Sequence, residues 1–195
     1  MASVASTYIT PEEYLEQERE AETRSEYFRG EVFAMSGGTY QHSVIVANLI
    51  GELRDRLRKT PCKVTSSDLR LAIASANLYT YPDVMVICGD PVFVDQRSDT
   101  VLNPVLIIEV LSGSTRNYDR AQKFKYYRTL SSFSEYLTVA QDEVHIEQYT
   151  RQPDGRWMLA EYTDLLSPVP LASISVEIQL SDVYEKVEFE DRQAP

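Results

Sequence analysis

The chain has 195 residues, 43% of them hydrophobic and 25% charged, which is ordinary for a water-soluble globular protein. This length allows one domain with a sizeable core, and we expect a single domain over residues 1–195. The formal net charge of −11 argues against binding of nucleic acid through a generally basic surface. It leaves room for a local basic groove, or for positive charge supplied by metal ions.

The apolar runs are far shorter than a membrane-spanning helix, so we expect no association with a membrane. Residues 1–7 lack the basic region and the apolar core of a secretory signal. Cys62 and Cys88 form neither a disulfide framework nor a metal motif. We therefore expect a reducing, cytoplasmic location and two structural thiols.

The first predicted elements are a short helix, a hairpin and a long helix. Thr10, Pro11 and the acids that follow are typical of a helix start, which predicts a helix over residues 10–20. Alternation of apolar and polar residues over 26–35 predicts a β-hairpin. An apolar stripe at helical spacing over 43–58 predicts the clearest helix of the chain.

Strands dominate the remainder of the chain. The order of elements predicts an α/β fold with a central mixed β-sheet flanked by helices. Its core would span about residues 42–140, with the N-terminal hairpin and a C-terminal β-hairpin as additions. The expected elements are strands near 62–73, 81–87, 104–110 and 135–139, another helix over about 116–130, and a hairpin of 144–149 and 157–162.

Two of these apolar strands each carry a single carboxylate, Asp83 and Glu109. A buried acid is costly unless it is paired, protonated or bound to a metal. If the strands are antiparallel neighbours with Asp83 opposite Glu109, the two Cβ atoms lie roughly 5 Å apart on one face. Such a pair indicates a site for Mg²⁺ that could act on a phosphate. One alternative is that Asp83 simply follows Pro82 at the start of a strand, where acids often form turns or caps. The other is that Glu109 is structural and has a cationic partner.

Lys123 lies between Tyr127 and Leu130 on the helical wheel, on a partly apolar face that we expect to face the sheet. An ammonium group there could neutralise an attacking hydroxide or a phosphate in its transition state. The alternative is an ion pair with Asp119, four residues earlier on the same helix, worth a few tenths of a kcal/mol.

Three segments together resemble a large bacterial restriction endonuclease family of the PD-(D/E)XK nuclease superfamily. The similarity extends from Gly30-Glu31 through His42 and Ser67-Asp68-Leu69-Arg70 to about Tyr149, and so covers most of the chain. The three segments are Pro82-Asp83-Val84, Ile108-Glu109-Val110-Leu111-Ser112 and Asp119-Arg120-Ala121-Gln122-Lys123-Phe124-Lys125-Tyr126-Tyr127.

The resemblance implies a restriction-endonuclease-like core that hydrolyses DNA phosphodiester bonds with Mg²⁺ or Mn²⁺ held by Asp83 and Glu109. The superfamily pattern places a lysine two residues after the second acid, where this chain has Leu111. In this family the matching lysine lies on the following helix, at Lys123. Catalysis by this centre therefore depends on whether Lys123 reaches the two acids.

The family also suggests supporting roles for Glu31 and His42 near the site. Glu31 is either a third acid or an exposed turn residue, and His42 is either a supporting residue or a structural histidine. Glu52 falls to one side of the apolar stripe of its helix, so it is solvated or points at the site. His145, in an alternating strand, receives no role.

Two other functions compete with an endonuclease. The acidic total and the missing strand lysine favour a binding or scaffold module that keeps the fold but has lost efficient cleavage. A hydrolase acting on another phosphate-containing substrate is the third interpretation. An endonuclease would have DNA as its partner, and a homodimer would suit the cutting of two strands.

Overall fold

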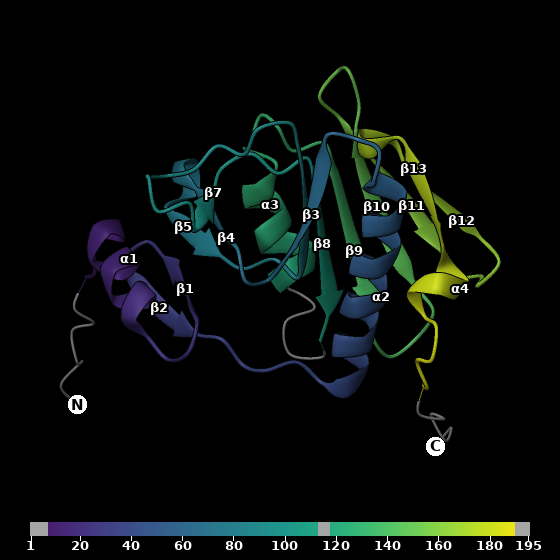
Figure 1. Cartoon of the computed structure of the whole chain (residues 1–195), viewed down its shortest axis with the longest axis horizontal. Helices are drawn as coiled ribbons and strands as arrows, with labels where there is room; N and C mark the ends of the chain where they lie inside the picture. The colour runs from purple at the N-terminus through teal and green to yellow at the C-terminus, as the bar shows by residue number, and fades with distance from the viewer. Residues whose placement is uncertain (1–7, 113–117, 190–195) are drawn as a thin grey trace.

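The computed structural model has a central mixed sheet of six strands in the order β11-β10-β9-β8-β6-β3 (Figure 1). β8 and β9 are parallel, and the other neighbouring pairs are antiparallel. The predicted central mixed sheet is therefore confirmed. The strands are β3 (Cys62–Ser66), β6 (Val84–Cys88), β8 (Leu106–Leu111), β9 (Glu135–Ala140), β10 (Ile146–Arg151) and β11 (Trp157–Tyr162).

A second sheet of five strands has the order β2-β1-β5-β4-β7 and includes the predicted N-terminal hairpin. The region 62–73 is thus two strands in two different sheets, separated by a turn in which the Leu69 amide bonds to the Ser66 carbonyl. The second sheet consists of β1 (Ser25–Phe28), β2 (Glu31–Ala34), β4 (Arg70–Ile73), β5 (Leu78–Thr80) and β7 (Thr100–Val101).

The predicted first two helices are present as α1 (Pro11–Glu20) and α2 (Tyr40–Leu57). Thr10 caps α1 in a capping box with Glu13, and Thr39 caps α2 by accepting a bond from the His42 amide. The smaller elements are η1 (Ala74–Ala76), the π-helix η2 (Tyr118–Lys123), α3 (Phe124–Tyr127), β12 (Pro168–Leu171), η3 (Ala172–Ile174), β13 (Val176–Gln179) and α4 (Leu180–Val183).

The structure describes residues 8–112 and 118–189. The expectation for residues 1–7 lies outside this part, and so does the predicted start, at residues 116 and 117, of the helix expected over about 116–130. Where it is described, that helix is a π-helical turn followed by a short α-helix, and it ends at Tyr127 rather than at residue 130.

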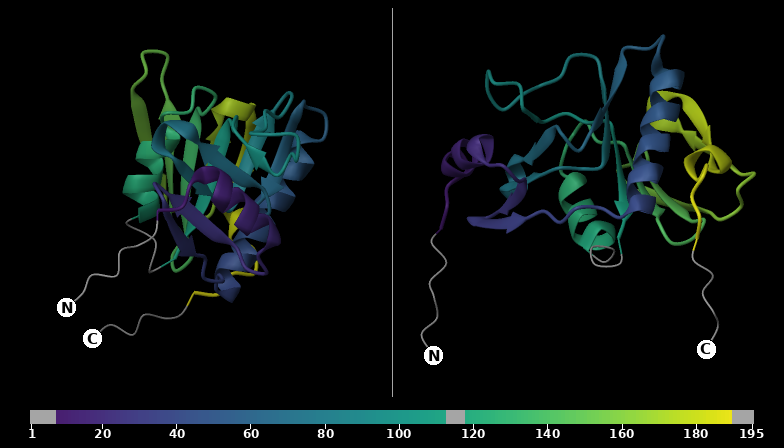
Figure 2. Two further views of the ribbon diagram at one scale, coloured as in Figure 1. Left: turned by 90° about the vertical axis from the view of Figure 1, so that its left-hand side faces the viewer. Right: turned by 60° about the horizontal axis from the view of Figure 1, so that its bottom comes forward.

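The two faces of the six-stranded sheet are covered differently (Figures 1 and 2). One face packs against α2 through Ile45, Leu49 and Leu53, all fully buried. The opposite face packs against α3 and the second sheet, with Phe124 and Tyr127 in its core. Because side chains alternate along a strand, one strand supplies both cores.

The expectation of two structural thiols is wrong, because Cys62 and Cys88 form a disulfide. The antiparallel register of β3 and β6 places them directly opposite each other, with Cα atoms 3.9 Å apart. Their separation of 26 residues gives no hint of this pairing. Within residues 8–112 and 118–189, no helix is long and apolar enough to cross a membrane.

Candidate active site

Asp83 and Glu109 meet at one edge of the pairing between β6 and β8. The strands are antiparallel, with Val84 opposite Ile108, and one step further along this register Asp83 lies opposite Glu109. The Asp83 amide donates to Glu109 Oε2 at 3.4 Å, and the Val110 amide donates to Asp83 Oδ2 at 2.8 Å. The predicted antiparallel pairing is confirmed, and it places both acids on the face that packs against α3.

Lys123 reaches Glu109 from the π-helix. Its ammonium lies 3.4 Å from Glu109 Oε1, and the whole residue is 8% exposed. It also lies 3.2 Å from Asp119 Oδ1, so the contact with the strand acid and the pair four residues apart both form. Leu111, at the position where the superfamily pattern has a lysine, is buried in the sheet. We call Asp83, Glu109, Lys123, Asp119 and Glu26 the buried centre.

Glu26 is the member of the buried centre that sequence reasoning missed. It extends from β1 in the second sheet, and its Oε1 lies 3.2 Å from the Lys123 ammonium. The Thr80 hydroxyl donates to the same oxygen. The available signal was an acid in a strand-like segment, and the pairing of β1 with β5 that brings it inward is not visible in the sequence.

Tyr127 is a second residue that was missed as part of the site. Its hydroxyl donates to Glu109 Oε1 at 2.7 Å, from the helical turn after Lys123. The spacing of four residues places both side chains on one helix face, which was the available signal. The Tyr127 hydroxyl and the Lys123 ammonium therefore both contact the same oxygen of Glu109, Oε1.

His42 lies next to Asp83, as the family resemblance suggests. Its Nε2 lies 3.2 Å from Asp83 Oδ2, and it extends from the first turn of α2. The hydrogen bond with Asp83 raises the pKa of His42 above its ordinary value. An imidazole in this place orients the Asp83 carboxylate.

The structure does not bring Glu31 or Glu52 to the buried centre. Glu31 is exposed at the start of β2, the edge strand of the second sheet. Glu52 pairs with Arg56, which also contacts Asp182 near the C-terminal end of the described chain. It lies ten residues after His42 on one helix, which separates the two by about 15 Å along the axis.

The charges of the buried centre are strongly coupled. Burial, opposed by Lys123 and assisted by Asp119 and Asp83, raises the pKa of Glu109 to about 8. Burial works to lower the pKa of Lys123, but Glu109, Glu26 and Asp119 together raise it well above its ordinary value. The lysine therefore stays charged, and Glu109 can hold a proton near neutral pH.

The donor set suits a hard divalent cation. Asp83, Glu109, Glu26 and Asp119 present carboxylate oxygens, which Mg²⁺ and Mn²⁺ prefer over nitrogen or sulfur. Asp119 Oδ1 is buried and accepts no hydrogen bond from the described residues, although the Lys123 ammonium is close to it. A metal ion at this oxygen would therefore share it with the Lys123 ammonium.

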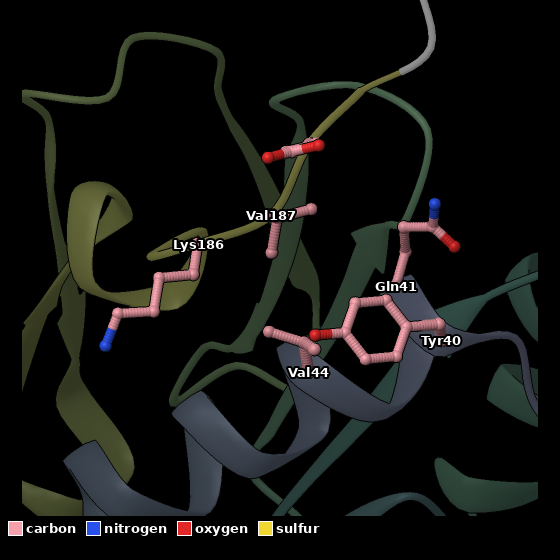
Figure 3. A pocket seen from close by; sticks show the side chains of 6 residues that line it. Tyr40, Gln41, Val44, Lys186 and Val187 are labelled. Carbon is pink, nitrogen blue, oxygen red and sulfur yellow. The ribbon is translucent and has the colours of Figure 1, made fainter.

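A surface hollow is lined by other residues than those of the buried centre (Figure 3). It has a volume of about 270 Å³ and lies between the first turns of α2 and the C-terminal segment of the described chain. Tyr40, Gln41 and Val44 line it from the helix, opposite Lys186, Val187 and Glu188. The candidate site is therefore defined by converging charged side chains and not by this hollow.

Comparisons with known proteins identify the family of this chain. Residues 11–181 match the Uma2 family, described as "Putative restriction endonuclease". Two uncharacterized proteins of Synechocystis sp. (strain ATCC 27184 / PCC 6803 / Kazusa) are similar to this chain. One is 40% identical over 83% of this chain and 92% of its own length, and the other is 36% identical over 93% and 94%.

A solved structure shows the same fold. It is the crystal structure of a "putative nuclease belonging to DUF820" from Anabaena variabilis ATCC 29413, with a TM-score of 0.74 and 17% identity. The match covers 90% of this chain and 97% of that chain. The chain belongs to the Uma2 family and has the restriction-endonuclease-like α/β fold that its sequence predicts.

Proposed function

We propose that this protein is a divalent-metal-dependent endonuclease that hydrolyses DNA phosphodiester bonds at the buried centre. The observation that carries the proposal is the meeting of Lys123 with Glu109, beside Asp83, on one sheet face. The family description and the fold support the same class of activity.

Asp83 and Glu109 would hold Mg²⁺ or Mn²⁺, with Glu26 or Asp119 as a further oxygen ligand. The bound ion would activate a water molecule and offset negative charge on the phosphate. Lys123 would neutralise charge that develops on the attacking or phosphate oxygens. His42 and the Tyr127 hydroxyl would hold the carboxylates of Asp83 and Glu109 in place.

The charge of the centre bears on the pH dependence of metal binding. Burial is the main cause that raises the pKa of Glu109 to about 8, and a metal ligand must lose its proton. Metal binding at Glu109 should therefore tighten as the pH rises toward that value. The bound cation would also offset part of the acidity of the chain, whose formal net charge is −11.

Plasmid cleavage tests the proposal. Supercoiled DNA is incubated with the protein and Mg²⁺ or Mn²⁺, and with EDTA as the metal-free control. We expect nicking that stops with EDTA and falls by about 10²–10³-fold or more in Asp83→Asn and in Lys123→Met, because each loses a charge needed in the transition state.

Asp154→Asn is the matched control, since Asp154 lies at the turn between β10 and β11 and pairs with Arg156. Circular dichroism establishes that each variant is folded. Cleavage that persists in folded Asp83→Asn would mean a contaminating nuclease or a different site.

A non-cleaving binding module is the second candidate, favoured by Leu111 at the usual lysine position and by the acidic total. In that case a gel-shift assay detects DNA binding by the wild type while no metal supports cleavage. Light scattering in the same buffers measures whether the protein is the homodimer that cutting both strands would suit.

A further inference from the structure

A row of polar side chains continues from the buried centre across the sheet. The register places Glu109 opposite Thr138, Thr138 opposite Glu147, and Glu147 opposite Glu161. Directly opposed residues leave the same face of a sheet, so this acidic row runs from β8 to β11 on the face that packs against α3. His145, two residues before Glu147, lies on the same face.

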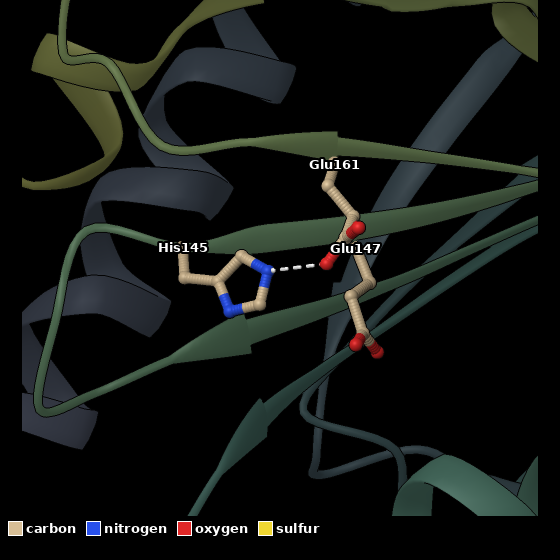
Figure 4. A group of neighbouring side chains, drawn as sticks. All are labelled: His145, Glu147 and Glu161. Carbon is tan, nitrogen blue, oxygen red and sulfur yellow. Dashed lines mark hydrogen bonds and ion pairs between the residues drawn. The ribbon is translucent and has the colours of Figure 1, made fainter.

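His145, Glu147 and Glu161 converge at the outer end of this row (Figure 4). Each offers one ligand atom, and these three atoms lie within 4.8 Å of one another. His145 Nε2 lies 3.1 Å from Glu161 Oε1. We call these three residues the hairpin cluster.

Neighbouring hydroxyls hold the Glu147 side chain in place, and a further bond fixes the backbone of His145. Thr138 and Tyr149 donate their hydroxyl hydrogens to Glu147 Oε2, at 3.1 Å and 3.3 Å. The backbone amide of His145 donates to the Tyr184 hydroxyl at 3.1 Å. Outer hydrogen bonds of this kind orient metal ligands before the ion binds.

The cluster carries more negative charge than its contacts offset. Glu147 and Glu161 face each other directly across the two strands, which is unfavourable for like charges. Arg120 from the π-helix contacts Glu147 Oε1 at 2.8 Å. The Glu161 carboxylate contacts the imidazole ring of His145. Each carboxylate oxygen can accept at two positions, so Glu147 can contact Arg120 and a cation together.

We infer that the hairpin cluster binds a divalent transition-metal ion through His145, Glu147 and Glu161. One imidazole and two carboxylates form a donor set suited to Zn²⁺ or Mn²⁺, with open positions for water. The cluster lies two strands away from Glu109, or roughly 10 Å, which exceeds the spacing of about 4 Å in a shared two-metal site. It is a separate site.

Titration of the full chain with Zn²⁺ tests this inference. The chain has two histidines, His42 and His145, so His42→Gln identifies their imidazole signals by NMR. We expect Zn²⁺ to shift the His145 signals in the wild type and equally in Asp83→Asn, which separates this site from the proposed nuclease centre. Calorimetry should show binding weakened by about tenfold or more in His145→Gln and in Glu161→Gln.

We expect Glu161→Gln to fold normally, because the Glu161 side chain is 57% exposed. Weaker binding in this variant would therefore reflect the lost ligand and not misfolding. Asp154→Asn, at the other end of the same hairpin, is the control for adventitious binding to surface acids. The inference is overturned if Zn²⁺ leaves the His145 signals unmoved, or if His145→Gln binds Zn²⁺ as tightly as Asp154→Asn does.

Discussion

The buried centre and the hairpin cluster lie on one face of one sheet and differ mainly in burial. One π-helix supplies a cation to each, Lys123 to Glu109 and Arg120 to Glu147. The Lys123 side chain is 10% exposed and contacts three carboxylates, whereas the Arg120 side chain is 31% exposed. Similar ion pairs should therefore differ several-fold in their effect on stability, because water screens the outer one.

The largest effect should follow removal of the buried cation. We expect Lys123→Met to lower the free energy of unfolding by about 3–5 kcal/mol, because three acids lose their partner. Arg120→Met should cost about 1 kcal/mol, because the Arg120 and Glu147 side chains are 31% and 12% exposed and water partly screens the pair. Urea unfolding of the two variants under the same conditions measures both values, and equal costs would remove the distinction between the two clusters.

A smaller effect should follow loss of the Tyr127 hydroxyl. We expect Tyr127→Phe to cost about 1 kcal/mol near neutral pH, rising to about 1.5–3 kcal/mol where Glu109 is ionised. Tyr126→Phe is the control, because that ring packs on Phe28 and lies next in the same helix. If Tyr127→Phe lowers the free energy of unfolding equally near neutral pH and at a pH where Glu109 is ionised, the Tyr127 hydroxyl does not interact with the charge of Glu109.

The pH dependence of stability should distinguish the buried acid. Burial raises the pKa of Glu109 to about 8, so the folded chain holds a proton that the unfolded chain releases near pH 4.5. The stabilisation that protonated Glu109 contributes is fully present below about pH 4.5. It is lost as the pH rises to about 8, and the free energy of unfolding falls by at most about 1.4 kcal/mol per pH unit.

The measurement is the difference in unfolding free energy between the wild type and Glu109→Gln in EDTA across this pH range. Taking the difference cancels the contribution of groups that both proteins share. The wild type should lose stability relative to the variant as the pH rises, and a constant difference would contradict the raised pKa.

Local sequence patterns were sufficient for the first two helices and most strands of the six-stranded sheet, and they singled out three residues of the buried centre. The capped apolar stripe predicted α2, and single acids in apolar strands drew attention to Asp83 and Glu109. Helical spacing placed Lys123 toward the sheet, where it is buried. Periodicity and the cost of burying charge are properties of short segments, so the sequence alone carries them.

Only the tertiary structure decided which distant segments meet. It brought Glu26 rather than Glu31 to Lys123, paired Cys62 with Cys88, and placed His145 in a cluster of possible ligands. Each of these depends on strand order and register between segments far apart in the chain. Local periodicity does not specify such pairings, because many registers satisfy the same alternating pattern until the whole core is packed.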